Sequence, residues 1–104
     1  MLTAERFAAH VEKGDLPLLI DFRAPWRGPC RAMAPAFEQA AQALEPRVRL
    51  VKVNTDEEQC LAAAFGVQSI PALALVHKGR EIARTAGAMP AAALVQWTTG
   101  QPGG

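Results

Sequence analysis

The sequence predicts an α/β fold in which helices cover both faces of a central mixed β-sheet. Short apolar runs typical of strands alternate with segments whose apolar residues recur at helical spacing. The second half of the chain then holds two strand-like runs around Lys78-Gly79, a pair suited to a hairpin turn. Alternating elements followed by a hairpin favour a mixed sheet between helices. The 104 residues, 50% of them hydrophobic, suit one core, so we expect a single domain over 1–104.

The first two expected elements are a helix and a buried strand. Apolar residues recur at helical spacing between Thr3, a suitable N-cap, and Gly14, a suitable stop. Residues 16–22, LPLLIDF, form an almost continuous apolar run, which is typical of a strand that is buried on both faces. Asp21 is anomalous in such a strand.

A longer helix is expected over 29–44, where alanines, Met33 and Phe37 lie along one helical stripe. Pro29 suits the first turn, because the N–H that proline lacks has no intrahelical partner there. Pro35 lies inside the same stretch. We expect it to kink the helix, since it cannot donate a hydrogen bond and it crowds the preceding turn.

The remaining segments complete the alternation of strands and helices. Residues 47–54 alternate basic and apolar side chains, as a strand with one polar face does. A third helix is expected to start after Thr55 or Asp56 and to run to Phe65, with Gly66 ending it. The other expected elements are strands at 70–77 and 81–87 and a helix at 89–99.

The charge and composition of the chain indicate which classes of binding partner are not expected. Eleven basic and ten acidic side chains give a net charge of +1, so no overall field favours nucleic acid or an anionic membrane. No apolar run approaches the roughly 20 residues that a bilayer-spanning helix needs, and the start does not resemble a secretory signal. Two cysteines and two histidines are too few for a disulfide framework or a structural zinc site. We therefore expect a cytoplasmic monomer with no metal, no cofactor, no nucleic acid and no membrane contact.

Four sequence motifs follow one another along the chain in a characteristic order and at characteristic spacings. They are IDFRAPWRGPCRAMAP at 20–35, VKVNTD at 51–56, SIPA at 69–72 and KGREIARTAGA at 78–88. In this order they resemble the active-site strand, loop and helix, the central strand, the cis-proline loop and the closing hairpin of the thioredoxin family. The resemblance covers almost the whole chain and implies a thioredoxin fold and thiol–disulfide exchange with protein substrates. It is closest to bacterial thioredoxins of the second type, without their zinc ribbon, and we expect the first strand of the fold to be truncated to a stub of Met1 and Leu2.

Two departures from the family touch this chemistry. The family carries a tryptophan at the position of Arg23 and a nucleophilic cysteine at the position of Arg27, whereas Cys30 matches its resolving cysteine. In dithiol exchange the first cysteine attacks the substrate disulfide and the second resolves the mixed disulfide. A guanidinium is not nucleophilic and does not lose its proton at neutral pH. We therefore expect dithiol exchange to be lost.

The resemblance also implies two further catalytic residues beside Cys30. Asp21 matches the buried carboxylate that accepts a proton from the resolving thiol, and Lys52 matches the lysine that pairs with it. The alternative is that both persist as a structural pair without chemistry. Burial raises the pKa of such a carboxyl and a lysine lowers it, so the sequence leaves the direction of the shift open.

A peptide-binding groove is another property that the resemblance implies. Pro71 stands at the position of the family's cis-proline, which leaves the backbone of Ile70 free to pair with an extended peptide. The residues expected to line the groove are Trp26, Gly28, Pro29, Ile70, Pro71, Gly87 and Ala88. The alternative is that these are ordinary turn and surface residues.

The thiol and the arginines of the active-site segment leave further alternatives open. Cys30 is either a reactive monothiol near a helix N-terminus, favoured by Arg27 and Arg31, or a buried and inert thiol. The arginines Arg23, Arg27 and Arg31 either gather around a phosphate, a sulfate or an acidic peptide, or are solvated. We also expect Arg23 to form an ion pair with Asp56, because the resemblance places a donor and a carboxylate at these positions.

The favoured interpretation is a thioredoxin-like protein of the protein-disulfide reductase lineage. It binds a protein or peptide at the groove beside Pro71, and it has lost its own dithiol chemistry. The alternatives are a monothiol oxidoreductase that forms mixed disulfides through Cys30, and a variant of an otherwise active thioredoxin.

Overall fold

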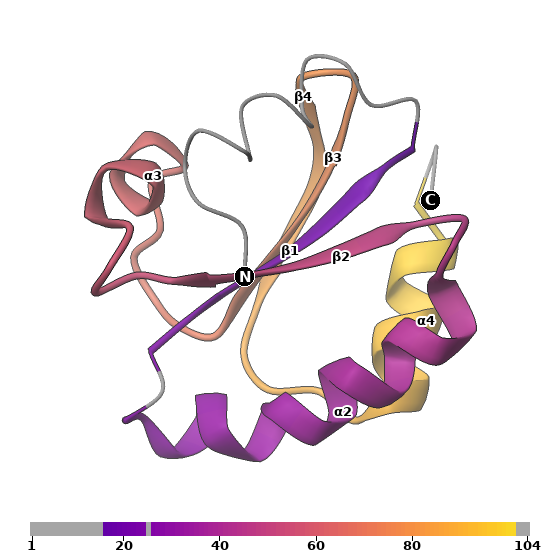
Figure 1. The fold of residues 1–104 in the computed structure, drawn as a ribbon, viewed down its shortest axis with the longest axis horizontal. Coiled ribbons are helices and arrows are strands. Elements are labelled where there is room, and N and C mark those ends of the chain that lie inside the picture. The colour runs from indigo at the N-terminus through magenta and orange to yellow at the C-terminus, as the bar shows by residue number, and fades with distance from the viewer. Residues whose placement is uncertain (1–15, 25, 102–104) are drawn as a thin grey trace.

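The computed structural model describes residues 16–24 and 26–101 (Figure 1). The expected stub at Met1 and Leu2 and the expected helix at 3–14 lie outside the described residues. The elements within them are, in chain order, β1 (Leu18–Arg23), α2 (Gly28–Leu44), β2 (Arg49–Asn54), α3 (Gln59–Ala64), β3 (Ala72–His77), β4 (Arg80–Ala86) and α4 (Ala91–Thr99). The alternation expected over this part of the chain is confirmed.

The described strands form one mixed sheet in the order β2-β1-β3-β4. β1 pairs in parallel with β2 and antiparallel with β3, and β3 pairs antiparallel with β4. Parallel neighbours need a crossover connection, which α2 provides between β1 and β2. The β3–β4 hairpin turns at Lys78 and Gly79, whose φ angles are 53° and 78°. Positive φ at both positions fits a two-residue hairpin turn, so the predicted turn is confirmed.

Helices lie on both faces of the sheet (Figure 1). Side chains of β1 alternate between the faces, and both faces are apolar, which explains the almost continuous apolar run of this strand. The core on the side of α2 and α4 contains Leu19, Met33, Phe37, Ala40, Leu44, Val48, Leu73, Leu75 and Leu94. The core on the side of α3 contains Leu18, Ile20, Phe22, Val51, Val53, Ala72, Ala74 and Val76, with Leu61, Phe65 and Val67 packed against it.

The helix α2 begins one residue before Pro29 and continues through Pro35. Its buried stripe consists of Cys30, Met33, Phe37, Ala40 and Leu44, at the helical spacing that the sequence indicates. In the part of the chain that the structure describes, none of the helices has both the length and the apolar character required to cross a bilayer.

The helix α3 is shorter than expected, because the chain after β2 first makes a turn. The backbone oxygen of Asn54 accepts hydrogen bonds from the N–H groups of Glu57 and Glu58, at 3.2 and 2.9 Å. The side-chain Oδ1 of Asn54 accepts another from the N–H of Asp56 at 2.9 Å. Asparagine stabilises turns in this way, and the turn delays the helix until Gln59.

Candidate functional site

The ends of β1 and β2, the start of β3 and the start of α2 lie at one end of the sheet (Figure 1). β1 and β2 are parallel and end together, with Arg23 opposite Asn54. At the same end, Ala72 at the start of β3 pairs with Phe22 on one side and with Ala86 on the other. The loops attached to these strand ends and the first residues of α2 carry Trp26, Arg27, Gly28, Pro29, Asp56, Ile70, Pro71, Gly87 and Ala88. We call this set of residues the loop end.

The Pro71 segment of the loop end has the geometry that the resemblance implies. The peptide bond between Ile70 and Pro71 is cis. The carbonyl oxygen of Pro71 accepts a hydrogen bond from the N–H of Gly87 at 2.9 Å, which brings these two loops together. Gly87 has a φ of 99°, a conformation that favours glycine. Ile70 is half-buried, and its backbone N–H and C=O make no hydrogen bond with any described residue. These two groups are therefore available to another chain.

The start of α2 presents an aromatic ring and a cation to solvent. Arg27 is the N-cap residue, with an extended backbone and no capping hydrogen bond from its side chain. Its guanidinium carbon lies 5.7 Å from the centre of the Trp26 ring, a cation–π contact. Trp26 is 65% exposed and Arg27 is exposed as well. The position that the resemblance assigns to the nucleophile thus holds an exposed cation.

Cys30 lies in the first turn of α2 but is only 3% exposed. It is a free thiol, and Cys60, which is exposed on α3, is free as well. A thiol that attacks a protein disulfide needs access to that disulfide. The burial of Cys30 therefore favours the alternative of an inert thiol over that of a reactive one.

Asp21 is buried beneath α2, on the same face of the sheet as Leu19. It is 1% exposed, and its Oδ1 makes no hydrogen bond with a described residue. Burial raises the pKa of this carboxyl from 3.8 to about 6, against the opposing charges of Arg23 and Lys52. The sequence left the direction of this pKa shift open. In the structure the effect of desolvation is larger than the attraction of the carboxylate to the two cations, so the pKa rises.

Lys52 does not pair directly with Asp21, contrary to the expectation from the resemblance. The two residues are opposite each other in the β1–β2 ladder. The ammonium group, however, donates to Oε1 of Glu38 on α2 at 2.8 Å. This hydrogen bond, followed by the positive charge itself, lowers the pKa of Glu38. Glu38 is solvated, so Lys52 keeps its charged end near water, while Asp21 lies too deep for a hydrated ammonium group to follow.

The expected ion pair between Arg23 and Asp56 is wrong. Asp56 instead accepts a hydrogen bond at Oδ2 from the indole Nε1 of Trp26, at 2.6 Å. The Nε of Arg23 is buried and makes no hydrogen bond with a described residue. Side chains two residues apart on a strand share a face, so Arg23 lies with Asp21 on the α2 side. The three arginines differ in exposure: Arg23 is half-buried, whereas Arg27 and Arg31 are exposed.

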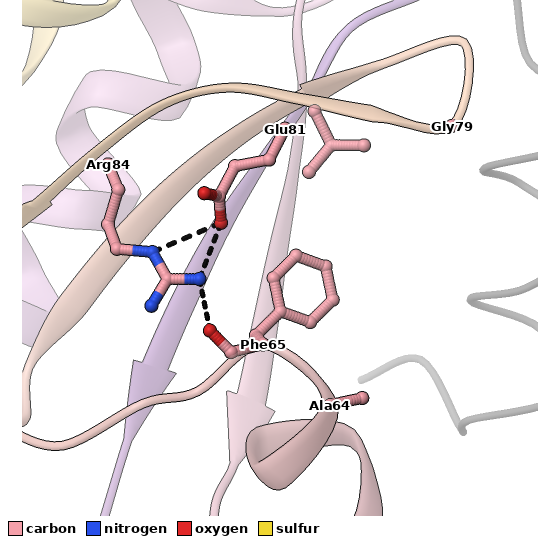
Figure 2. Close-up of a pocket in the computed structure, with 6 residues that line it drawn as sticks. Ala64, Phe65, Gly79, Glu81 and Arg84 are labelled. Atoms are coloured by element: carbon pink, nitrogen blue, oxygen red, sulfur yellow. Dashed lines mark hydrogen bonds and ion pairs between the residues drawn. The ribbon is translucent and has the colours of Figure 1, made fainter.

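A separate hollow of about 290 Å³ lies between the end of α3 and the β3–β4 hairpin (Figure 2). Its lining residues are Ala64, Phe65, Val76, Gly79, Glu81 and Arg84. Arg84 donates to Oε1 of Glu81, with Nε at 3.0 Å, and to the carbonyl oxygens of Phe65 and Gly66. Arg84 and Glu81 therefore form an ion pair with each other in this hollow (Figure 2).

Sequence reasoning missed the roles of Glu38 and Arg84. Glu38 lies 14 residues before its partner Lys52, and Arg84 lies 19 residues after Phe65. Neither pair leaves a local signal such as helical or strand spacing. Among the side chains that the structure describes, no group of three His, Cys, Asp or Glu residues is arranged to hold a metal ion.

Comparison with known proteins identifies the family. The family model Thioredoxin matches residues 1–100. Thioredoxin 1 from Nostoc sp. is 41% identical over 95 residues, which cover 91% of this chain and 89% of that protein. Thioredoxin from Haemophilus influenzae is 41% identical over 91 residues, which cover 88% of this chain and 85% of that protein. The crystal structure of chloroplastic thioredoxin z has a TM-score of 0.84 and 29% identity, covering 95% of this chain and 89% of that one. Together with the mixed sheet and its flanking helices, these matches show that the chain has the thioredoxin fold and belongs to the thioredoxin family, a lineage of thiol–disulfide oxidoreductases.

Proposed function

We propose that this protein binds an extended segment of a partner protein at the loop end and does not catalyse dithiol exchange itself. One observation carries the proposal: the residue three positions before Cys30, at the N-cap of α2, is Arg27. Under this proposal the protein still binds a partner protein, as members of the family do, but it does not exchange disulfides with that partner.

The loss of dithiol exchange follows from the chemistry of the step. A thiolate must attack one sulfur of the substrate disulfide, and the other sulfur leaves as a thiolate. A second thiol in the enzyme then displaces the substrate and forms an internal disulfide. Arg27 has no sulfur for either bond, and Cys60 is a free thiol on a different helix. Cys30 has no second cysteine at the N-cap with which to complete the cycle.

Peptide binding needs none of these sulfur atoms. The backbone of Ile70 offers an unpaired N–H and C=O, as an edge of a sheet does when it accepts an additional strand. Trp26 supplies exposed apolar surface, and its ring is held by the hydrogen bond to Asp56. Aromatic side chains of this kind are frequent centres of binding energy in interfaces.

Reduction of insulin disulfides by dithiothreitol tests the proposal. The unaltered protein should give no turnover above the reaction without protein, whereas Arg27→Cys should raise it severalfold. A matched control is Arg80→Cys, which places the same new thiol at the opposite end of the sheet. Turnover by the unaltered protein that is lost on Cys30→Ala would contradict the proposal. If Arg27→Cys gave no more than Arg80→Cys, the explanation through Arg27 alone would be wrong.

A second candidate is a monothiol oxidoreductase that acts through Cys30. The relatives are named as thioredoxins, which favours a protein that is active in thiol chemistry. In this route the Cys30 thiolate attacks a partner's disulfide and forms a mixed disulfide, which an external thiol then resolves. The 3% exposure of Cys30 opposes it, because the attack requires the sulfur to be reachable.

A further inference from the structure

We infer that the loop end selects peptides with an acidic side chain, and that Arg27 is the residue that recognises the acid. The inference rests on the proposed function, since it names the class of peptide that the loop end binds. It starts from the arginine itself, which is exposed at the loop end beside Trp26.

Arg27 has no carboxylate partner in the part of the chain that the structure describes. The ion pairs found there join Lys52 to Glu38 and Arg84 to Glu81. The first turn of α2 holds no acidic residue, although acidic residues are frequent and stabilising in that position. Arg27 therefore stands without a counter-charge from its own helix.

The surroundings of Arg27 hold it at the surface. Its guanidinium lies against the face of Trp26, and the edge of the same ring donates to Asp56. The nearby carboxylate thus already has one oxygen bonded to the indole. Arg31, one turn further along α2, is exposed and has no ion pair with a described residue either. The surface beside Trp26 therefore combines an apolar ring with two exposed guanidinium groups that form no ion pair with a described residue, while the charge of Asp56 lies at the edge of the ring that bonds to it.

A bound peptide would displace water from this surface. The effect on the free energy of binding depends on which side chain of the peptide lies opposite Arg27. A guanidinium that loses its water without gaining acceptors is left with unsatisfied donors, which costs free energy. An apolar or basic side chain opposite Arg27 would have this effect. A carboxylate would replace the water with charge-assisted hydrogen bonds, in the bidentate geometry that arginine favours. The arrangement thus favours a peptide that places Glu or Asp opposite Arg27 while its backbone pairs with Ile70.

The test uses three capped nine-residue peptides, rich in Val and Thr and identical except for Glu, Gln or Lys at the centre. Each is titrated into the isotopically labelled full-length protein, and the amide signals of Ile70 and Gly87 report binding. The Glu peptide should bind about three- to fivefold more tightly than the Gln peptide at low salt, and the Lys peptide most weakly. Raising the salt concentration should reduce the preference.

Two variants locate the charge that is responsible. Arg27→Gln should reduce the Glu-over-Gln preference to about one, whereas Arg80→Gln, an exposed arginine at the other end of the sheet, should leave it unchanged. Equal affinities for the Glu and Gln peptides would overturn the inference and leave the proposed function standing. A preference that survives Arg27→Gln would also overturn it. If no peptide shifts the Ile70 signal, or if the protein alone dimerises through this surface, the proposed function fails as well.

Discussion

The indole Nε1 of Trp26 lies 2.6 Å from Oδ2 of Asp56 and donates a hydrogen bond between residues that are 30 positions apart. The bond joins the loop after β1 to the turn after β2. It fixes the orientation of the exposed ring that forms the apolar part of the loop end.

Removing this hydrogen bond should lower the free energy of unfolding only slightly. Trp26→Phe and Asp56→Ala should each cost about 0.5–1 kcal/mol, because the bond is charge-assisted but exposed to water. Urea unfolding of both variants and of the double variant measures the coupling between the two side chains. Fully additive effects would show that the hydrogen bond does not form in solution.

The buried carboxyl of Asp21 should make the protein less stable as the pH rises from about 4 to about 6. Its pKa is about 6 in the folded state and 3.8 when freely solvated, because burial disfavours the charged form. The folded protein therefore binds a proton in this interval that the unfolded chain has already released. The contribution of Asp21 to the free energy of unfolding therefore falls with increasing pH, by roughly 3 kcal/mol in total. Above the folded pKa this contribution is constant.

Asp21→Asn isolates this contribution, since all other titrating groups are kept. Urea unfolding between pH 4 and pH 7 should show a free energy of unfolding that decreases more in the unaltered protein than in the variant. Parallel pH profiles for the two proteins would rule out the assignment to Asp21.

Arg23 should influence the pKa of Asp21 more than Lys52 does. Arg23 lies on the same face of the same strand, and its charge lowers the pKa of Asp21 more than the charge of Lys52 does. Lys52 is bound to Glu38, which neutralises part of its charge. Titration of the Asp21 carboxyl carbon by NMR should therefore show a larger upward shift for Arg23→Met than for Lys52→Met. Glu38→Gln serves as the control and should shift the pKa downward, because it leaves the Lys52 charge uncompensated. The opposite ranking of Arg23 and Lys52 would contradict the placement of Arg23.

Cys30 should react with iodoacetamide at least tenfold more slowly than Cys60 in the folded protein. Cys30 is 3% exposed, whereas Cys60 is exposed on α3, and alkylation requires contact with the sulfur. Mass spectrometry of the two cysteine-containing fragments measures both rates in one sample, and the difference should disappear in denaturant. A faster reaction at Cys30 would instead support the monothiol route.

Much of the fold could be predicted from local patterns. The apolar runs and helical stripes indicated all the strands and helices that the structure describes, and Lys78-Gly79 indicated the hairpin. The sequence predicts too early a start for α3, because apolar spacing does not reveal that the Asn54 side chain holds a turn. The face to which Arg23 belongs could have been inferred from strand alternation once β1 was known to continue to that residue.

The sequence by itself determined which side chain stands three positions before Cys30. That side chain is Arg27, and the proposed loss of dithiol exchange rests on its identity, because folding cannot change the atoms of a side chain. Only the tertiary structure decided which charges meet: Lys52 with Glu38 rather than Asp21, and Asp56 with Trp26 rather than Arg23. Periodicity is a property of neighbouring residues and is therefore visible in the sequence. The partner of a charged group depends instead on distances of a few ångströms between elements that are remote in the chain, and on how much water remains around each of them.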